Sequence, residues 1–301
     1  MSKILIRTDI HWSQYSSIIK ENGDKYSIRL EHLIDSVNWS ERLAEQYDCD
    51  LILDLGDFFD STKINHTEVS ALSEVKWSTI PHTYIVGNHE INSKDRELSS
   101  LNILKLLGFN IITEPTTVEE DKYILCYLPY MFEYPTLEEL FPTNKKRIVF
   151  SHNDVEGVVL GGYTFDKGFS LIDISKNCEL FLNGHIHAKG IFGNMINLGN
   201  LCGQNFGENN CPHNAYILDT ETLDLQEYEN PYSFNFYKID CTKTVKFPKF
   251  KNNPVLNIKC SEDTVEEVTE KLKGIEDLVA RKIILVPKVL EQEEIEEVDI
   301  I

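Results

Sequence analysis

Five short stretches of the sequence combine histidines with oxygen-bearing side chains in patterns that suit metal binding. The clearest is Gly184-His185-Ile186-His187, where two histidines one residue apart can converge on a single point if the backbone turns. A surface loop that happens to hold two histidines explains an isolated pair, but the same design recurs four times upstream. The candidate metal ligands are Asp9, His11, Asp57, Asn88, His152, His185 and His187.

This ligand set mixes nitrogen and oxygen donors and contains no cysteine. Such a set suits Mn²⁺, Fe²⁺ or Zn²⁺ better than Ca²⁺ or Mg²⁺. Seven ligands exceed the needs of one ion but suit two ions that share a bridging carboxylate, for which Asp57 is the central candidate. Two ions about 3.5–4 Å apart can activate a water and neutralise charge at a phosphoryl centre. We therefore expect two divalent cations, with Mn²⁺ as the first choice.

His89 follows the candidate ligand Asn88 directly. If Asn88 binds metal, the neighbouring imidazole is free to act as a general acid or as a hydrogen-bond donor to the transition state. We predict that His89 is the catalytic histidine. The alternative is a supporting or purely structural role.

The elements that must position these ligands are short apolar runs, each followed at once by one of the candidate side chains. The runs do not alternate with polar residues, which is typical of strands buried on both faces. In such sheets, ligands collect outside the carboxyl ends of the strands. We expect all seven side chains at one sheet edge, after strands at residues 3–6, 51–53, 83–86, 148–150 and 180–182.

Helices are expected between these strands. Apolar residues at a helical period predict a helix over 27–47, a second one capped by Thr67 that runs to Trp77, and a third over 98–107 that stops at Gly108. The alternation of strand and helix predicts parallel pairing. Residues 123–128 read as a strand, and Thr136 opens a short helix with a capping box. Later strands at 195–198, 215–218 and 223–225 suggest a meander in a second sheet packed on the first.

The chain divides by composition into three parts. Residues 1–235 form the expected two-metal domain, and a stretch with several prolines and lysines follows. Residues 236–290 are expected to form a small βαβ unit, with strands at 255–259 and 282–286. Its helix is expected to open with Thr264 and Glu267 as a capping box and to end at Leu272. Residues 291–301 read as an acidic tail.

Net charge and cysteine usage limit the function classes. The 301 residues carry 29 basic and 49 acidic side chains, a net charge of −20, whereas nucleic-acid binders usually show a basic footprint. DNA binding would therefore have to come from the metals, a local patch or a basic partner. The sequence has no signal peptide or membrane-spanning run, and its seven scattered cysteines are typical of reduced thiols, so we expect a cytoplasmic protein.

In order along the chain, the motifs DxH, GD, GNHE, a lone H and GHxH resemble those of the calcineurin-like metallophosphoesterases over about residues 3–225. This resemblance implies an α/β, four-layer α-β-β-α sandwich that binds two metals. It assigns Asp9, His11, Asp57 and His187 to one ion, and it gives His89 the catalytic role. The same match assigns Asp57, Asn88, His152 and His185 to the other ion.

Secondary motifs are similar to those of SbcD-type DNA-repair nuclease subunits, and most of all to the small recombination-endonuclease subunits of T-even-type phages. They include Leu128-Pro129-Tyr130 and the segment 204–208. The unit after Pro254 is placed like the DNA-capping domain of that branch. Asp60 stands where cellular members usually carry a histidine beside the scissile phosphate, and Asn200 replaces the usual Ser or Thr, so both are candidate substrate contacts.

Three functions remain open at this point. The first is a DNA exonuclease or endonuclease subunit; the resemblance then implies a homodimer and an SbcC-type, SMC-like ATPase partner. The host cytoplasm would be its location if the chain is phage-encoded. The second is a phosphatase or phosphodiesterase for a small molecule or phosphoprotein, which the acidic charge favours. The third, a degenerate scaffold, conflicts with the complete ligand set. The helices that grip the ATPase in the family are not recognisable before the chain ends.

Overall fold

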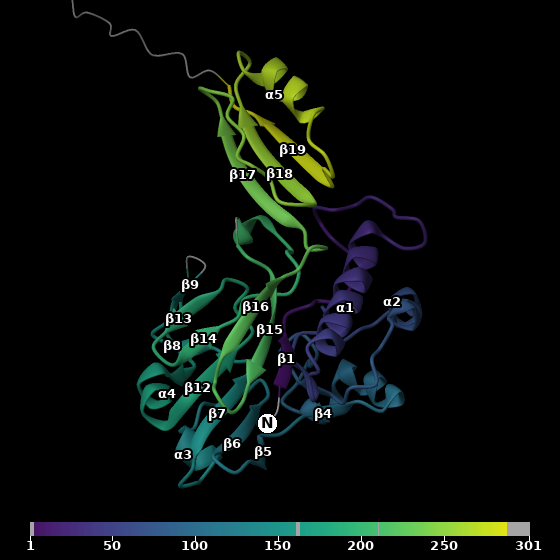
Figure 1. Ribbon diagram of the computed structural model, residues 1–301. Helices are drawn as coiled ribbons and strands as arrows, with labels where there is room; N and C mark the ends of the chain where they lie inside the picture. The colour runs from purple at the N-terminus through teal and green to yellow at the C-terminus, as the bar shows by residue number, and fades with distance from the viewer. Residues whose placement is uncertain (1–2, 161–162, 210, 288–301) are drawn as a thin grey trace, which may run out of the picture.

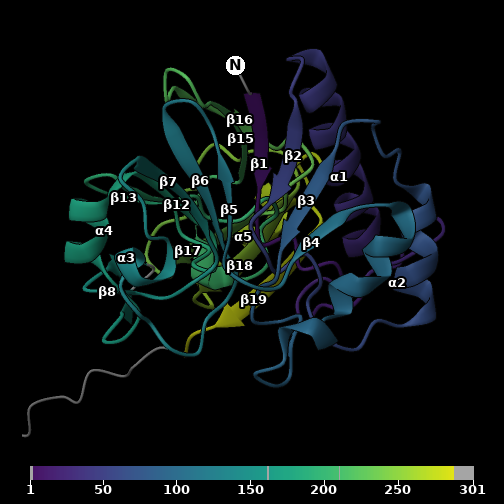
Figure 2. The same cartoon turned by 90° about the horizontal axis from the view of Figure 1, so that it is seen from below.

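Two six-stranded sheets packed face to face form the main body of the protein (Figures 1 and 2). The computed structural model describes residues 3–160, 163–209 and 211–287. The acidic tail expected at 291–301 lies outside these residues. In the described part of the chain, no helix is long and apolar enough to cross a membrane.

The first sheet has the order β16-β15-β1-β2-β3-β4. Strands β1 to β4 run parallel, and β15 pairs antiparallel with both β1 and β16. The strand bounds are β1 (Lys3–Arg7), β2 (Leu51–Asp54), β3 (His82–Ile85), β4 (Asn110–Ile112), β15 (Asn214–Asp219) and β16 (Leu225–Glu229).

The second sheet has the order β13-β14-β12-β7-β6-β5, with β14, β12, β7 and β6 parallel and an antiparallel strand at each edge. Its strands are β5 (Thr116–Glu119), β6 (Tyr123–Leu128), β7 (Lys146–Ser151), β12 (Cys178–Asn183), β13 (Gly190–Phe192) and β14 (Met195–Asn197). Two short ribbons lie beside it: β8 (Val155–Glu156) with β11 (Phe169–Ser170), and β9 (Val159–Leu160) with β10 (Tyr163–Thr164).

Helices cover the outer face of each sheet, so the layers follow the order α-β-β-α, as expected (Figure 2). The first sheet is covered by α1 (Ile28–Gln46), α2 (His66–Ala71) and the 3₁₀ turns η1 (Leu72–Glu74), η2 (Arg96–Leu98) and η3 (Ser100–Leu107). The second is covered by α3 (Leu137–Leu140) and α4 (Leu171–Asn177).

The central strands are buried on both faces, as their apolar runs predict. In β1, Ile4 and Ile6 pack between the two sheets, while Leu5 packs under α1. In β12, Leu182 faces the space between the sheets and Phe181 faces the α3 and α4 layer. Full burial of such side chains contributes roughly 1.5–3 kcal/mol each, which fixes the strand ends that carry the candidate ligands.

The helix predicted over 27–47 forms as α1, with Ser27 as its N-cap, and the strand predicted at 123–128 forms as β6. Several other local predictions are wrong. Asn65, not Thr67, caps α2, and the helix ends at Ala71 rather than near Trp77, because the backbone tightens into η1. The segment before Gly108 is a 3₁₀ helix, although Gly108 does end it with φ 82°. The capping box of α3 at Thr136 forms as predicted.

The expected meander does not form, because its strands belong to different sheets. Strand β14 pairs beside β12 in the second sheet, whereas β15 and β16 return to the first sheet beside β1. The expectation of one common sheet edge is wrong for the same reason. Strands β1, β2 and β3 lie in one sheet, and β7 and β12 lie in the other.

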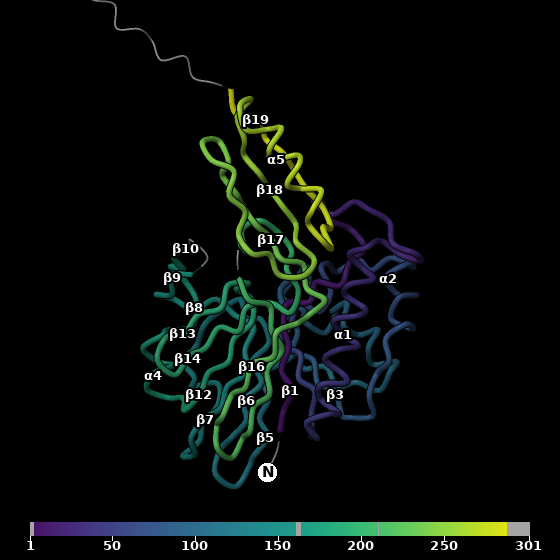
Figure 3. Tube along the Cα trace, turned by 45° about the horizontal axis from the view of Figure 1, so that its top comes forward, coloured from purple at the N-terminus to yellow at the C-terminus, as the bar shows by residue number. Residues whose placement is uncertain are grey.

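A third, parallel sheet projects from one end of the sandwich (Figures 1 and 3). It contains β17 (Asn235–Cys241), β18 (Pro254–Cys260) and β19 (Ala280–Leu285), and α5 (Val265–Leu272) packs on one face. Strand β17 was not predicted from the sequence. The predicted domain boundary at residue 235 coincides with the first residue of this strand. The side chain of Thr264 bonds to Ser261 instead of capping α5, so the expected capping box is absent.

Candidate metal centre

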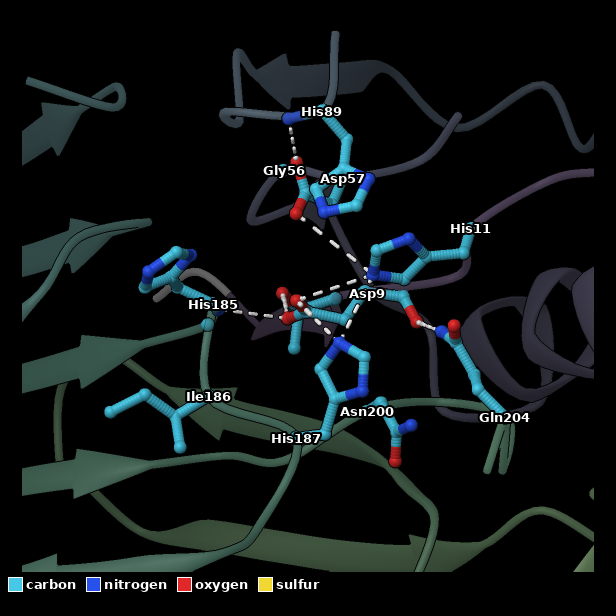
Figure 4. A network of polar contacts seen from close by, with 12 residues as sticks. Asp9, His11, Gly56, Asp57, His89, His185, Ile186, His187, Asn200 and Gln204 are labelled. Atoms are coloured by element: carbon cyan, nitrogen blue, oxygen red, sulfur yellow. Dashed lines mark hydrogen bonds and ion pairs between the residues drawn. The ribbon is translucent and has the colours of Figure 1, made fainter. Parts of the chain in front are cut away.

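The seven predicted ligands follow the carboxyl ends of five strands, and Figure 4 shows Asp9, His11, Asp57, His185 and His187 drawn together. Asp9 and His11 follow β1, Asp57 follows β2, and Asn88 follows β3. His152 follows β7, and His185 and His187 follow β12 in the second sheet. Both sheets therefore contribute, and the centre lies where their strand ends meet.

One group of side chains forms the first candidate metal position. Nε2 of His11 lies 3.1 Å from Nε2 of His187. Oδ1 of Asp9 lies 3.7 Å from the His187 atom and 3.9 Å from the His11 atom. Asp57 adjoins this group, since its Oδ2 lies 3.9 Å from Nε2 of His11.

A second group lies on the other side of Asp57. Oδ2 of Asp57 is 3.1 Å from Nε2 of His152. Oδ1 of Asn88 lies 3.2 Å from the same nitrogen and 2.9 Å from Nδ1 of His185. Asp57 is the residue common to the two groups, which is the position expected of a bridging carboxylate.

The imidazoles are oriented so that an unprotonated nitrogen faces each position. Nδ1–H donates from His11 to Oδ1 of Asp60 (2.9 Å) and from His187 to Oε1 of Glu208 (2.7 Å). Metal-binding histidines usually donate their second N–H in this way. The two Nε2 atoms then face each other at 3.1 Å, a separation that a shared proton or a cation bound by both rings would accommodate.

The second position is supported in the same manner. Nδ1–H of His152 donates to the carbonyl of Leu55 (2.7 Å), and Nε2–H of His185 donates to Oδ1 of Asp154 (3.0 Å). This leaves Nε2 of His152 and Nδ1 of His185 facing the oxygens of Asp57 and Asn88. All four imidazoles therefore have an outer hydrogen-bond acceptor, which leaves the inner nitrogen of each ring to bind a metal once it is deprotonated.

Asp9 provides an independent test of whether a cation fits. Its Oδ2 accepts hydrogen bonds from Oγ1 of Thr8 (2.5 Å) and from the backbone N–H of His185 (2.9 Å). Its Oδ1 is buried and has no hydrogen-bond partner among the described residues. An unpaired buried carboxylate oxygen is costly, and a metal ion bound beside His11 and His187 would satisfy it.

The charge balance points the same way. Burial alone lowers the pKa of His152, but the charges of Asp57 and Asp9 and a hydrogen bond to Asp57 raise it to about 9. For His11, burial alone lowers the pKa, but the hydrogen bond to Asp60 and the nearby charges of Asp57 and Asp9 raise it to about 10. The centre thus holds an excess of negative charge that favours bound cations.

The outer carboxylates are ionised at neutral pH. Burial alone raises the pKa of Asp60, Asp154 and Glu208, but in each case the hydrogen bond and charge of the facing imidazole lower it below its usual value. These three carboxylates fix the orientations of the rings of His11, His185 and His187. Ionised acceptors also make the ring nitrogens better metal ligands.

Backbone strain is concentrated at the centre. Asp9, His11, Asp57 and His185 have φ values of 51°, 50°, 52° and 72°, which non-glycine residues rarely adopt. Such strain persists only where the surroundings enforce it. Close packing adds to this constraint: a Cβ on Gly87 would lie 2.2 Å from Oδ1 of Asp57, and one on Gly184 would lie 2.9 Å from Oδ2 of Asp9.

His89 lies at the rim of the centre, above His11 in Figure 4. Its backbone N–H donates to Oδ1 of Asp57 (2.9 Å), and its Nδ1–H donates to the carbonyl of Asp60 (2.9 Å). The ring of His89 meets that of His11 edge-on, with centroids 4.6 Å apart. Its side chain is 42 % exposed, so its Nε2 can reach a group bound at the metals.

The two predicted substrate contacts are placed differently from each other. Asp60 is partly exposed beside His89, but its carboxylate is used to orient His11. Asn200 is fully buried and accepts a hydrogen bond from Nδ1 of His213 (2.6 Å). The position of Asn200 therefore does not support the predicted direct substrate contact.

The sequence reading missed Asp154 and Glu208 as supports of the metal ligands. A signal existed for both. Asp154 follows the lone His152 by two residues, and Glu208 ends the 204–208 segment already noted for its resemblance to the nuclease branch. Neither spacing indicates which imidazole the carboxylate contacts, because these contacts join residues 31 and 21 positions apart.

Comparison with known proteins identifies the family. Residues 2–189 match the family described as calcineurin-like phosphoesterase. The chain is 26% identical over 204 residues to Exonuclease subunit 1 of Enterobacteria phage T4, an alignment that covers 63% of this chain and 58% of that protein. The chain thus spans less than two thirds of the length of this relative.

Solved structures show weaker likeness. One is a dimetal phosphatase from Danio rerio, with 12% identity, a TM-score of 0.45, and coverage of 76% of this chain and 96% of that one. Another is an archaeal phosphodiesterase, with 14% identity, a TM-score of 0.39, and coverage of 75% and 99%. The match to the family extends over more than half of the sequence and includes all five ligand motifs, so this chain belongs to the calcineurin-like phosphoesterases.

Proposed function

We propose that this protein is a metal-dependent DNA nuclease that hydrolyses phosphodiesters with two divalent cations, Mn²⁺ first among them. Asp9, His11, His187 and Asp57 would hold one ion. Asp57, Asn88, His152 and His185 would hold the other. Together the ions would supply a nucleophile at neutral pH and neutralise charge at phosphorus.

The observation that carries the DNA assignment is a row of lysines on the open face of the third sheet. Lys238, Asn257 and Lys282 are direct partners across β17, β18 and β19, so their side chains share the face opposite α5. Lys259, two residues beyond Asn257 on β18, points the same way. All three lysines are exposed. Asp240 lies opposite Lys259 on the same face, so the row keeps a net positive charge of two. It is the local basic patch that a chain of net charge −20 needs in order to contact a phosphate backbone.

A cavity beside the metal centre provides space for substrate. It measures about 350 Å³ and is bordered by His185 and His187 on one side. Its other walls include the apolar side chains of Leu160, Phe165, Ile186 and Ala188. Apolar and aromatic walls next to a phosphate site favour a ligand with a flat organic group beside its phosphate, as in a nucleotide.

The chain's own residues have separable roles in the proposed reaction. The rings of His11, His152, His185 and His187 are held by their outer acceptors, and with their inner nitrogens bound to metal they would not be available as proton donors. His89 keeps its Nε2 free. We assign to His89 the donation of a proton or hydrogen bond to the leaving oxygen, because it combines exposure with a fixed orientation.

The runner-up is a phosphatase or phosphodiesterase acting on a small molecule or phosphoprotein. Its support is the strongly acidic charge of the chain, which disfavours long polyanions. The two functions predict different substrates for the same centre. They can therefore be separated by one set of assays.

The test uses purified protein with Mn²⁺ on single-stranded DNA, double-stranded DNA, bis-p-nitrophenyl phosphate and p-nitrophenyl phosphate. We expect cleavage of DNA and of the diester. The double variant Lys238→Glu/Lys259→Glu should lose roughly an order of magnitude on DNA and retain diester hydrolysis. Lys273→Glu is the matched control, because Lys273 is an exposed lysine of the same unit that lies at the C-terminal end of α5. Hydrolysis of the monoester without cleavage of either DNA would contradict the proposal.

Partners remain part of the proposal. The phage T4 relative is named as a subunit, and we propose that this chain likewise pairs with itself and with an SbcC-type, SMC-like ATPase. The helices α1 and α2 are the proposed self-contact, where Val69 is a large apolar side chain 38% exposed. Sedimentation of the wild type and Val69→Asp tests the dimer. Co-purification with the cognate ATPase tests the second partner.

A further inference from the structure

A turn of six residues, 204–209, contacts the metal centre on one side and the third sheet on the other. It contains η4 (Phe206–Glu208) and follows β14 in the chain. Neither the ligand motifs nor the catalytic histidine belong to it. Its contacts nevertheless link the metal centre to the third sheet, which also packs on the segment around Ile19 through a buried cluster of its own.

Toward the metal centre, the hydrogen bonds of the turn that involve described residues go to the first candidate position. Oε1 of Glu208 accepts the hydrogen bond from Nδ1 of His187 at 2.7 Å. Nε2 of Gln204 donates to the backbone carbonyl of Asp9 at 3.2 Å, as Figure 4 shows. Glu208 is buried, whereas His187 is one-quarter exposed. The orientation of the His187 ring therefore depends on where Glu208 is held.

Within the turn, the Glu208 carboxylate is fixed by its own neighbours. Its Oε1 also accepts from the amide of Asn205 (3.0 Å), and its Oε2 accepts from the backbone N–H of Gln204 (2.8 Å). The Asn205 side chain in turn accepts from the N–H of Gly207 (2.7 Å). With these bonds in place, the carboxylate moves only with the turn as a whole.

Toward the third sheet, the turn is seated on β17. The ring of Phe206 meets that of Phe236 edge-on, with centroids 5.2 Å apart. Phe206 also packs against a buried cluster that includes Ile19 and Val255. The backbone N–H of Lys238 donates to Oδ1 of Asn209 at 2.7 Å. Lys238 is also one of the lysines proposed to contact DNA.

We infer that the 204–209 turn couples the position of the third sheet to metal binding by Asp9, His11 and His187. Glu208 is the positioning residue, and Phe206 and Asn209 transmit the seating of β17 to it. The second position has its own supports, Asp154 and Leu55, which belong to other segments. Displacement of the third sheet should therefore weaken the binding of the ion held by Asp9, His11 and His187 and leave the binding of the other ion unchanged.

This inference rests on the proposed two-metal centre and extends it to substrate binding. A DNA strand bound by the lysine row would contact the third sheet, on which the 204–209 turn packs. Substrate contact and occupation of one metal position would then favour each other, since linkage between two binding events is reciprocal.

The test measures Mn²⁺ binding to the full chain by calorimetry and by electron paramagnetic resonance, which distinguishes coupled ion pairs from isolated ions. Glu208→Gln and Phe206→Ala should each weaken one ion by roughly 10–100-fold, the usual effect of losing an outer support. The spectrum should change from a coupled pair to an isolated ion. Asn209→Ala, which removes one hydrogen bond and no packing, should shift affinity in the same direction by a smaller factor.

Phe250→Ala is the matched control, because Phe250 packs on Tyr237 at the α5 face of the same sheet and does not contact the turn. It should leave both ions bound as in the wild type. Asp154→Asn should weaken the ion that Glu208→Gln spares. Wild-type affinity for both ions in Phe206→Ala and Asn209→Ala would overturn the coupling while the metal centre stands. Fewer than two ions in the wild type would overturn the metal centre and the coupling with it.

Discussion

Oδ2 of Asp57 lies 3.1 Å from Nε2 of His152, and the two residues come from different sheets. Asp57 also approaches Nε2 of His11 to 3.9 Å, within its own sheet. The carboxylate is 2% exposed, and its other oxygen accepts the N–H of His89. A single carboxylate thus faces both candidate metal positions and is held by the loop that carries His89.

The first prediction concerns this shared carboxylate. Asp57→Asn should lose both ions, because the bridging charge serves both positions. His11→Ala should mainly weaken the ion it shares with Asp9 and His187. Metal content after dialysis, measured by elemental analysis, compares the two variants. Retention of two ions per chain in Asp57→Asn would show that Asp57 does not bridge.

The second prediction concerns His89. His89→Ala should keep both ions but lose roughly 10²–10⁴-fold in rate, the usual contribution of a general acid. The effect should be smaller on a diester with a good leaving group such as p-nitrophenolate, which needs less protonation. Steady-state rates on DNA and on bis-p-nitrophenyl phosphate provide the measurement. Loss of metal instead of rate would assign His89 a structural role.

The third prediction concerns Gly87, which packs against the bridging residue. In Gly87→Ala, the new Cβ would lie 2.2 Å from Oδ1 and 2.5 Å from the backbone nitrogen of Asp57, so Asp57 must shift. We expect loss of metal affinity with the fold retained. Gly157→Ala is the control: its Cβ meets nothing within 4 Å, although its φ of 88° adds strain. It should cost about 1 kcal/mol of stability and leave metal binding unchanged.

The fourth prediction concerns a buried ion pair beneath the centre. Glu41 accepts hydrogen bonds from Arg7 (2.9 Å) and His82 (3.0 Å), and both Arg7 and Glu41 are buried. Burial alone raises the pKa of Glu41, but the Arg7 charge and the His82 hydrogen bond lower it to about 2. Because the folded pKa is depressed, this stabilisation is present above the unfolded value of about 4.3 and is lost as pH falls toward 2.

Glu41→Gln should therefore destabilise the fold by about 3 kcal/mol at pH 7, where it leaves Arg7 with Asp54 as its remaining carboxylate partner. The difference in the free energy of unfolding between the variant and the wild type should become smaller below about pH 4. Urea unfolding of both proteins at pH 7 and at acidic pH measures it. A pH-independent difference would mean that packing, not charge, makes this pair stabilising.

The fifth prediction concerns DNA affinity. With three lysines in the proposed contact row and a net charge of −20, the chain alone should bind duplex DNA weakly. The slope of log K against log salt should be about −3 or shallower, since each neutralised phosphate contributes about −0.9. Fluorescence anisotropy over a salt series checks this. Nanomolar binding at physiological salt without a partner would contradict it.

The ligand set could be predicted from the sequence because its signal is local. Each candidate ligand follows a short apolar strand within a few residues, and the strands at β1, β2, β3, β7 and β12 all form as expected. Local patterns also predicted α1, and α3 together with its capping box at Thr136. These features depend on neighbouring residues, whose periodicity and hydrogen-bonding capacity are visible in the sequence.

Only the tertiary structure decided how the two sheets divide these strands and which carboxylate orients which imidazole. Asp9 accepts from the N–H of His185 across 176 residues, and Asn230 bonds to Ser36 across 194. The lysine row likewise exists only because β17, a strand not predicted, pairs in register with β18. Such contacts depend on strand pairing and sheet packing between distant segments, and hydrophobic periodicity within one segment contains no information about its partner.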